Sequence, residues 1–227
     1  MAAVAAKLTA RLGHAFRDPA LLRQALTHRS AGTGHNERLE FVGDAVLDCV
    51  MAELVYRRYP AMSEGELSRL RAALVNKDTL HRVAAALGVG DYVTLGEGEL
   101  KSGGGSRPSI LADALEALFG AVLIDGGFEA ARAAIERVFE AELAALDPSL
   151  GAKDPKTRLQ EWLQARRLPV PEYEVARVSG EAHAQRFEVV CRIAALDIAA
   201  EGSGPNRRAA EQAAATRAYD VALGAGG

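Results

Sequence analysis

The sequence predicts an all-α N-terminal domain followed by a small α+β domain with the element order α-β-β-β-α. The chain has 227 residues, of which 49% are apolar and only 5% aromatic, and it is rich in alanine and leucine. This balance favours helices for most of the length. Apolar residues recur at helical spacing up to position 146, and short strand-like runs follow a linker that contains proline and glycine. A chain of this size can bury one core in each domain.

The first domain is expected to span residues 1–146 and to consist of helices. Asp18-Pro19 predicts a helix start, because proline is favoured in the first helical turn. Ser63 and Glu66 have the spacing of a capping box, and Gly88 is placed to end a helix. The helices expected after the first cover residues 37–58, 63–74, 77–87, 109–124 and 128–146. Loops are expected at residues 28–36 and at the glycine-rich residues 96–108.

The second domain is expected at residues 154–224, behind a mobile linker at residues 147–153. Its predicted helices cover residues 156–167 and 209–223. Its predicted strands cover residues 173–178, 187–193 and 198–201.

Cysteine content, hydropathy and charge limit the class of protein. Cys49 and Cys191 lie far apart in apolar runs, which predicts neither a disulfide framework nor a zinc site and favours a reducing cytoplasm. The N-terminal apolar stretch precedes Lys7, the reverse of a signal peptide. The uncharged run 117–124 is shorter than the ~20 residues of a membrane span. We therefore expect a cytoplasmic protein without membrane association. With a net charge of -3, phosphate binding has to come from local basic patches or metal ions.

Acidic residues lie within two otherwise apolar helices of the first domain. Four of them follow one another at steps of three, four and four and share one helix face: Glu37, Glu40, Asp44 and Asp48. Asp113 and Glu116 form a second group in the helix predicted at 109–124. Carboxylates among apolar residues are costly unless a cation compensates them, and hard divalent ions such as magnesium prefer oxygen ligands. The spacing leaves two interpretations open, a divalent metal site and a solvated acidic surface.

Three other chemistries agree less well with the sequence. A di-iron carboxylate bundle requires Glu-x-x-His pairs, and the sequence contains none. The serine and histidine residues show no catalytic triad or nucleophile elbow. Gly103-Gly104-Gly105 lacks both the Gly-Lys-Ser/Thr of a phosphate-binding loop and a preceding strand.

The segment Asn-Glu-Arg-Leu-Glu-Phe-Val-Gly-Asp-Ala-Val-Leu at 36–47 closely resembles the signature of the ribonuclease III family, which includes Drosha and Dicer. Further segments resemble the family in the family's order, at 25–28, 64–68 and 109–117. The tail resembles a double-stranded-RNA-binding domain at 156–161, 171–173, 180–187 and 202–212. The resemblance covers nearly the whole chain.

The resemblance implies roles for individual residues of the first domain. Four match the family's metal-binding catalytic carboxylates, with the second and fourth nearest the chemistry: Glu40, Asp44, Asp113 and Glu116. Glu37 and Glu64 match acidic positions that line the same cleft in supporting roles. Phe41 matches a position whose side chain packs into the partner subunit, whereas without the resemblance it is interpreted as a core aromatic. The implied cofactor is Mg²⁺, two ions per site in the substrate complex, with Mn²⁺ as a substitute and no organic cofactor.

The resemblance also implies which residues contact RNA, through phosphates at a helix N-terminus and 2′-hydroxyls in the minor groove. They are Thr157, Gln160, Glu161, Gln164, His183, Arg207 and Arg208 in the tail, and Arg107 in the loop of the first domain. Three positions depart from the family. Asn206 replaces a serine and Ala209 a basic residue, which predicts weaker RNA affinity through the tail, and Pro108 replaces a charged residue beside Arg107.

The implied function is endonucleolytic hydrolysis of double-stranded RNA by a homodimer. A two-metal mechanism is expected to leave 5′-phosphate and 3′-hydroxyl ends with short 3′ overhangs. Precursors of ribosomal RNA and structured messenger RNA are the expected substrates. The alternative is a relative that binds double-stranded RNA without cutting it.

Overall fold

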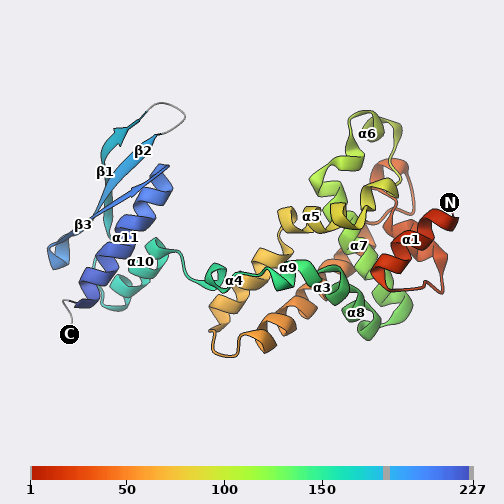
Figure 1. Ribbon diagram of the computed structural model, residues 1–227, viewed down its shortest axis with the longest axis horizontal. Coiled ribbons are helices and arrows are strands. Elements are labelled where there is room, and N and C mark those ends of the chain that lie inside the picture. The colour runs from red at the N-terminus through yellow and green to blue at the C-terminus, as the bar shows by residue number, and fades with distance from the viewer. Residues whose placement is uncertain (1, 181–184, 225–227) are drawn as a thin grey trace. The chain divides into compact units, whose positions relative to one another are not determined.

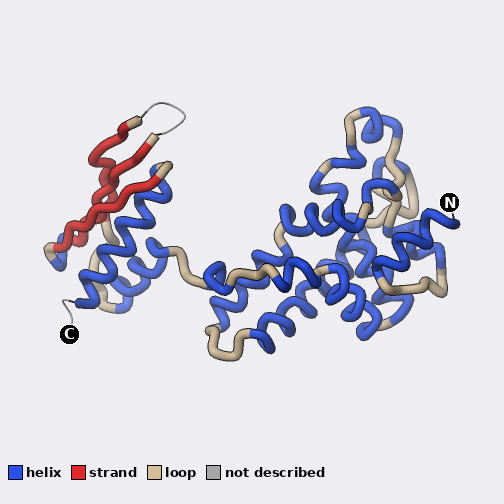
Figure 2. The backbone as a smooth tube through the Cα atoms, viewed as in Figure 1, coloured by secondary structure: helices blue, strands red, loops and turns tan. Residues whose placement is uncertain are grey.

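The computed structural model describes residues 2–180 and 185–224, which form two compact units (Figures 1 and 2). The units comprise Met1–Ala152 and Lys153–Gly227. The first contains helices as its regular elements, and the second contains a three-stranded antiparallel sheet with flanking helices. This architecture confirms the predicted fold class. Among the described residues, no helix is long and apolar enough to cross a membrane.

The first unit contains nine α-helices within the described residues. They are α1 (Ala2–Leu12), α2 (Pro19–Ala25), α3 (Glu37–Arg58), α4 (Glu64–Val75), α5 (Lys77–Leu87), α6 (Glu97–Lys101), α7 (Pro108–Gly126), α8 (Phe128–Val138) and α9 (Glu140–Ala144). The capping box of Ser63 and Glu66 opens α4, and the Asp18 side chain caps α2. Gly88 ends α5 with a left-handed φ of 74°, a conformation that glycine adopts without strain.

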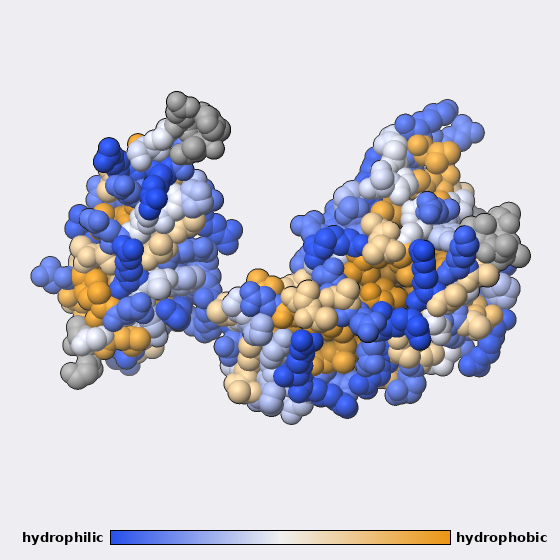
Figure 3. Space-filling view, viewed as in Figure 1, coloured by the Kyte–Doolittle hydropathy of each residue, from blue (hydrophilic) through white to orange (hydrophobic). Residues whose placement is uncertain are grey.

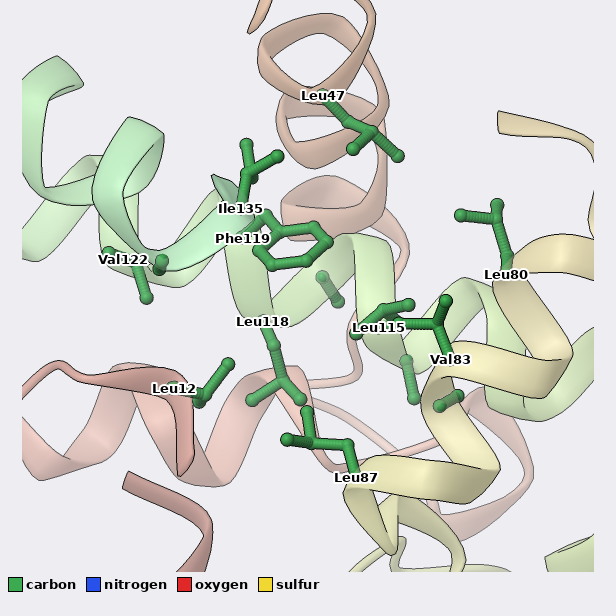
Figure 4. Close-up of a cluster of buried hydrophobic side chains, with 14 of the residues drawn as sticks. Leu12, Leu47, Leu80, Val83, Leu87, Leu115, Leu118, Phe119, Val122 and Ile135 are labelled. Carbon is green, nitrogen blue, oxygen red and sulfur yellow. The ribbon is translucent and has the colours of Figure 1, made fainter. Parts of the chain in front are cut away.

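Helix α7 lies among the other helices of this unit, and its apolar residues are buried around most of its circumference. Leu115, Leu118 and Phe119 project from it toward side chains of α1, α3, α5 and α8 (Figure 4). Its crossing with α3 depends on two glycines. A Cβ atom on Gly43 of α3 would overlap the carbonyl oxygen of Glu116, and one on Gly120 of α7 would overlap that of Leu39. The two backbones are therefore in direct contact.

Three segments differ from the sequence-based expectation. The loop predicted at 96–108 contains α6 and a short 3-10 helix, Gly104–Ser106. The single helix predicted at 128–146 is broken at Phe139, which is fully buried and packs on Phe119 with ring centroids 6.1 Å apart. Helix α1 was not predicted at all. At Phe139, packing of the buried ring against a distant residue interrupts a helix that local propensity would continue.

The expected linker also has structure at its start. Residues Pro148–Gly151 form a 3-10 helix that Asp147 caps through the amide of Ser149. The carbonyl oxygen of Gly151 accepts a hydrogen bond of 2.7 Å from Nε of Arg69 on α4. This part of the segment therefore packs onto the first unit, and the structure divides the chain after Ala152.

The second unit contains α10 (Pro155–Ala165), β1 (Glu172–Ser179), β2 (Arg186–Ile193), β3 (Ile198–Gly204) and α11 (Arg207–Gly224). The strands pair antiparallel in the order β1-β2-β3. Alternate residues of β2 are buried beneath the helices, namely Val189, Cys191 and Ile193. Because successive side chains of a strand point to opposite faces, Arg192 lies on the other face of the sheet. A Cβ on Gly202 would overlap the backbone nitrogen of Ala214, and glycine there lets α11 lie close to β3.

Candidate metal centre and nucleic-acid interface

The crossing of α3 and α7 brings together acidic residues that are more than 70 positions apart in the sequence. Glu40 comes from α3, and Asp113 and Glu116 come from α7. Each of these three residues offers one carboxylate oxygen, and the three oxygens lie within 4.8 Å of one another. Because Gly43 permits backbone contact beside Glu116, the sequence signature positions the cluster as well as supplying its ligands.

Burial and mutual repulsion dominate the electrostatics of this cluster. Burial is the largest cause that raises the pKa of Glu116, to about 8, and the charges of Asp44, Glu40 and Asp113 add to it. Burial likewise raises the pKa of Glu40 and of Asp113. A divalent cation bound by oxygen ligands would relieve this repulsion, and three converging carboxylates are a suitable donor set for it.

Asp44 and Asp48 continue the acidic face of α3 but differ in their surroundings. Asp44 is exposed, and its charge raises the pKa of both Glu40 and Glu116, so it borders the cluster. Asp48 lies one turn further and forms an ion pair of 3.8 Å with Arg71 of α4. Among the described residues, Asp48 therefore has a cationic side chain as a partner, whereas Asp44 has none.

An open hollow of ≈ 430 Å³ adjoins the cluster and carries both signs of charge. Its lining residues are His28, Arg29, Asn36, Glu37, Glu40, Glu99, Arg107, Ser109, Ile110 and Asp113. Glu37 forms a long ion pair of 3.4 Å with Arg29, and Arg107 forms one of 2.8 Å with Glu99. The sequence-predicted Glu37 and Arg107 thus lie together beside the metal-binding candidates.

The basic side of this hollow includes two residues for which no role was predicted from the sequence. His28 and Arg29 precede α3, and after Lys77, which has the largest lowering effect, they act to lower the pKa of Asp113. The Ser30 hydroxyl accepts a 2.9 Å hydrogen bond from the amide of Gly96, which ties this segment to the start of the 96–108 segment. The available signal was the resemblance at 25–28, which contains His28.

Glu64 and Phe41 lie outside this cluster in the single chain. Glu64 accepts a 2.8 Å hydrogen bond from Ser68 and lines a separate, more apolar hollow of ≈ 570 Å³. Other residues of α3 and α4 line it as well, among them Tyr56, together with Met62 from the segment between the two helices. Phe41, beside Glu40 in sequence, is 77% exposed, so it is not a core aromatic of the single chain.

The second unit presents the predicted RNA-binding residues on its surface. Four of them are exposed on α10 and two at the start of α11: Thr157, Gln160, Glu161, Gln164, Arg207 and Arg208. Glu161 is engaged by Lys153 in an ion pair. His183 lies outside the described residues. Asn206 accepts a 2.9 Å hydrogen bond from the amide of Ala209, as an N-cap serine would.

Comparisons with known proteins agree along both units. Residues 18–143 match the family model described as Ribonuclease-III-like, and residues 155–221 match the Double-stranded RNA binding motif. The chain is 60% identical over 209 residues to Ribonuclease 3 of Aromatoleum aromaticum, covering 92% of this chain and 93% of the relative. It is 57% identical over 213 residues to Ribonuclease 3 of Dechloromonas aromatica, covering 94% of this chain and 96% of the relative.

A solved structure resembles the first unit. It is the crystal structure of the nuclease domain of ribonuclease III from Campylobacter jejuni, with a TM-score of 0.59 and 44% identity over 62% of this chain and 97% of that one. A second structure of this domain concerns a flexible region involved in its dimer formation, with a TM-score of 0.58 and 45% identity over 60% of this chain and 95% of that one. The α3–α7 carboxylate cluster, the helical fold and the relatives along both units lead to one conclusion. The chain belongs to the ribonuclease III family, as an endoribonuclease with a double-stranded-RNA-binding domain.

Proposed function

We propose that the chain hydrolyses double-stranded RNA by a two-metal mechanism, leaving 5′-phosphate and 3′-hydroxyl ends with short 3′ overhangs. The observation that carries the proposal is the convergence of Glu40, Asp113 and Glu116 within 4.8 Å, with the pKa of Glu116 raised to about 8. For such a site, binding a divalent cation is more favourable than leaving the negative charge of the carboxylates uncompensated.

Four carboxylates would hold the metal: Glu40, Asp44, Asp113 and Glu116. Mg²⁺ is the proposed ion because all the donors are oxygens, and Mn²⁺ is an acceptable substitute. The chemistry that two such ions supply when bound is activation of a water molecule and stabilisation of the leaving 3′ oxygen. Glu116 would lose its proton when the site is loaded, because a carboxylate must be ionised to serve as a ligand.

The residues around the cluster orient the RNA. Arg29 and Arg107 line the same hollow as Glu40 and Asp113, so they would meet phosphates next to the scissile bond. Glu37 supports the site through its ion pair with Arg29. Glu64 forms no ion pair with the residues that the structure describes, and its supporting role remains a prediction for the dimer.

Duplex binding is assigned to the second unit, proposed as residues 154–224 behind the linker 147–153. The exposed side chains of α10 would reach 2′-hydroxyls in the minor groove, and Arg207 and Arg208 would meet phosphates at the N-terminus of α11. His183, which follows β1 and precedes β2 in the sequence, is likewise proposed to contact ribose 2′-hydroxyls. Such contacts read the shape of an A-form helix, so little sequence preference is expected.

A homodimer of the catalytic domain, residues 1–146, would place one site on each strand of the duplex. The exposed Phe41 and the apolar hollow beside Tyr56 and Met62 are complementary features, which a two-fold axis would bring together twice. Bacterial relatives named Ribonuclease 3 and two unpaired cysteines support a cytoplasmic protein that processes ribosomal RNA precursors and structured messages.

The test is incubation of the purified full chain with long duplex RNA and with single-stranded RNA of the same sequence, with Mg²⁺ or with EDTA. We expect short fragments from the duplex with Mg²⁺ alone, bearing 5′-phosphates on end analysis. Binding of duplex without fragments in either buffer would favour the alternative, a non-catalytic RNA-binding relative.

A further inference from the structure

Two cations from different helices of the second unit share one carboxylate. Lys156 lies in the first turn of α10, and Arg207 is the first residue of α11. Glu211, one turn along α11, accepts a hydrogen bond of 2.6 Å from Nζ of Lys156 at Oε2 and one of 2.8 Å from Nε of Arg207 at Oε1. The two cationic groups therefore lie side by side although the sequence separates them by 51 positions.

The pair is held firmly. The Glu211 side chain is only 12% exposed, and the hydrogen bonds from Lys156 and Arg207 lower its pKa. The ammonium of Lys156 also lies 4.2 Å from the ring centroid of Tyr173 on β1, a cation–π contact. Lys156 is thus fixed by a strand and a helix at once, which reduces the entropy lost when it binds a further group.

Both cations keep donors for an anion. An ammonium has three N–H groups, and the described contacts of Lys156 use one of them in a hydrogen bond, with its side chain 35% exposed. Arg207 donates to Glu211 through Nε, and its terminal nitrogens belong to a side chain that is 64% exposed. The free N–H groups that begin α11, an 18-residue helix, add positive potential at the same place.

We propose that Lys156 is a phosphate-binding residue that acts together with Arg207 on the backbone of a nucleic-acid duplex, with Glu211 as the residue that positions both. The inference rests on the proposed binding of double-stranded RNA and adds a cation from α10 to the two arginines of α11. The ligand class is a phosphodiester backbone, because neighbouring cations held at fixed spacing match neighbouring phosphates.

The test measures affinity for a blunt RNA duplex, longer than the ~16 base pairs that one such domain spans, as a function of salt concentration. The full chain is used in EDTA so that the RNA stays intact. Lys156→Gln and Arg207→Gln are each expected to flatten the slope of log K against log salt by about one, the loss of one phosphate contact. Lys156→Arg keeps a cation there and is expected to retain the slope.

The matched control is Arg192→Gln, which removes a charge from the sheet face opposite the helices. A Lys156→Gln slope equal to that of Arg192→Gln, with Arg207→Gln flattened, would overturn the role of Lys156 and leave duplex binding intact. No duplex binding by the unaltered chain would overturn the proposed function as well.

A second measurement needs no substitution. Amine acylation of the unaltered chain, with and without duplex, is followed by mass spectrometry. Protection of Lys156 by the duplex relative to Lys7, an exposed lysine of α1 in the other unit, is the expected result. Equal labelling of Lys156 in both conditions would contradict the proposal.

Discussion

In Glu116, burial and the like charge of neighbouring carboxylates act in the same direction. Its carboxylate lies within the cluster of Glu40 and Asp113, and its pKa is raised to about 8. We predict that Glu116→Gln stops cleavage of duplex RNA in Mg²⁺ while leaving duplex binding unchanged. The expected loss of rate exceeds about 100-fold, since changes to residues that merely support metal ligands already cost 10–100-fold. Single-turnover cleavage and gel-shift assays measure the two properties.

The matched control is Glu97→Gln on α6, a glutamate that is almost fully exposed and, in the described part of the chain, pairs with Lys101. It should cleave at the rate of the unaltered chain. Full cleavage by Glu116→Gln would remove Glu116 from the site.

The raised pKa of Glu116 also predicts how the stability of the metal-free protein depends on pH. A carboxyl group with a folded-state pKa of about 8, against 4.5 ordinarily, holds its proton in the folded state over that window and loses it in the unfolded state. The free energy of unfolding should therefore fall as pH rises from about 5 to about 8. Burial raises the pKa of Glu40 and Asp113 in the same direction.

Thermal unfolding in EDTA at a series of pH values measures this effect, where each kcal/mol moves the midpoint by about 2–4 °C. Glu116→Gln has no titratable group at this position. Its unfolding midpoint should therefore depend less on pH and should be higher at alkaline pH than that of the unaltered chain. The same slope in both proteins would contradict the assigned pKa.

At the residue scale, the sequence could predict which carboxylates exist on one face but not how each is compensated. Asp44 and Asp48 have the same helical spacing, yet Asp48 pairs with Arg71 from another helix. The pair of Arg107 with Glu99 likewise depends on how residues 96–108 fold. These contacts join distant segments, and periodicity along one helix contains no information about them.

At the scale of elements, the crossing of α3 and α7 controls the geometry of the site. We predict that Gly43→Ala destabilises the first unit by about 1–3 kcal/mol, because its Cβ would overlap the carbonyl oxygen of Glu116 and force the helices apart. A displacement near 1 Å at a catalytic group can lower the rate by about 100-fold. Thermal unfolding and cleavage rates measure the two effects.

Gly98→Ala on α6 is the control, since a Cβ there meets no atom within 4 Å. If Gly43→Ala retained both the stability and the rate of the Gly98→Ala variant, the contact between the two backbones would not be needed for the site.

Local signals predicted most elements and failed where packing decides. The bounds of α3 and α5 agree with the sequence because Pro60 lies just beyond α3 and Gly88 ends α5. The break at Phe139 has no glycine or proline to announce it and arises because the buried ring packs against Phe119. The five-residue helix α6 is too short to show a periodicity.

At the scale of the whole molecule, dimerisation is the predicted property that depends on exposed apolar surface. Charged and polar residues cover much of the visible surface of both units, with apolar residues gathered across part of the first (Figure 3). Burying Phe41 is worth about 1.5–3 kcal/mol, and a two-fold interface would bury it twice. Phe41→Ser should therefore raise the dimer dissociation constant at least about tenfold.

Sedimentation equilibrium over a range of protein concentrations measures that constant. Leu100→Ser is the control, because this side chain on α6 is similarly exposed, at 67%, and is not assigned to the interface. Equal dissociation constants for the two variants would place the interface elsewhere.

The proposed cleavage of RNA depends on divalent cations bound by carboxylates of α3 and α7. Mn²⁺ shares the oxygen ligands of Mg²⁺ and is paramagnetic. Electron paramagnetic resonance during titration of Mn²⁺ into the RNA-free chain measures the free ion, and the bound ions follow by difference. We predict bound Mn²⁺ in the unaltered chain and its loss in the Glu40→Gln/Asp113→Asn double variant, with binding kept in Glu97→Gln. Undiminished Mn²⁺ binding in the double variant would contradict the metal centre.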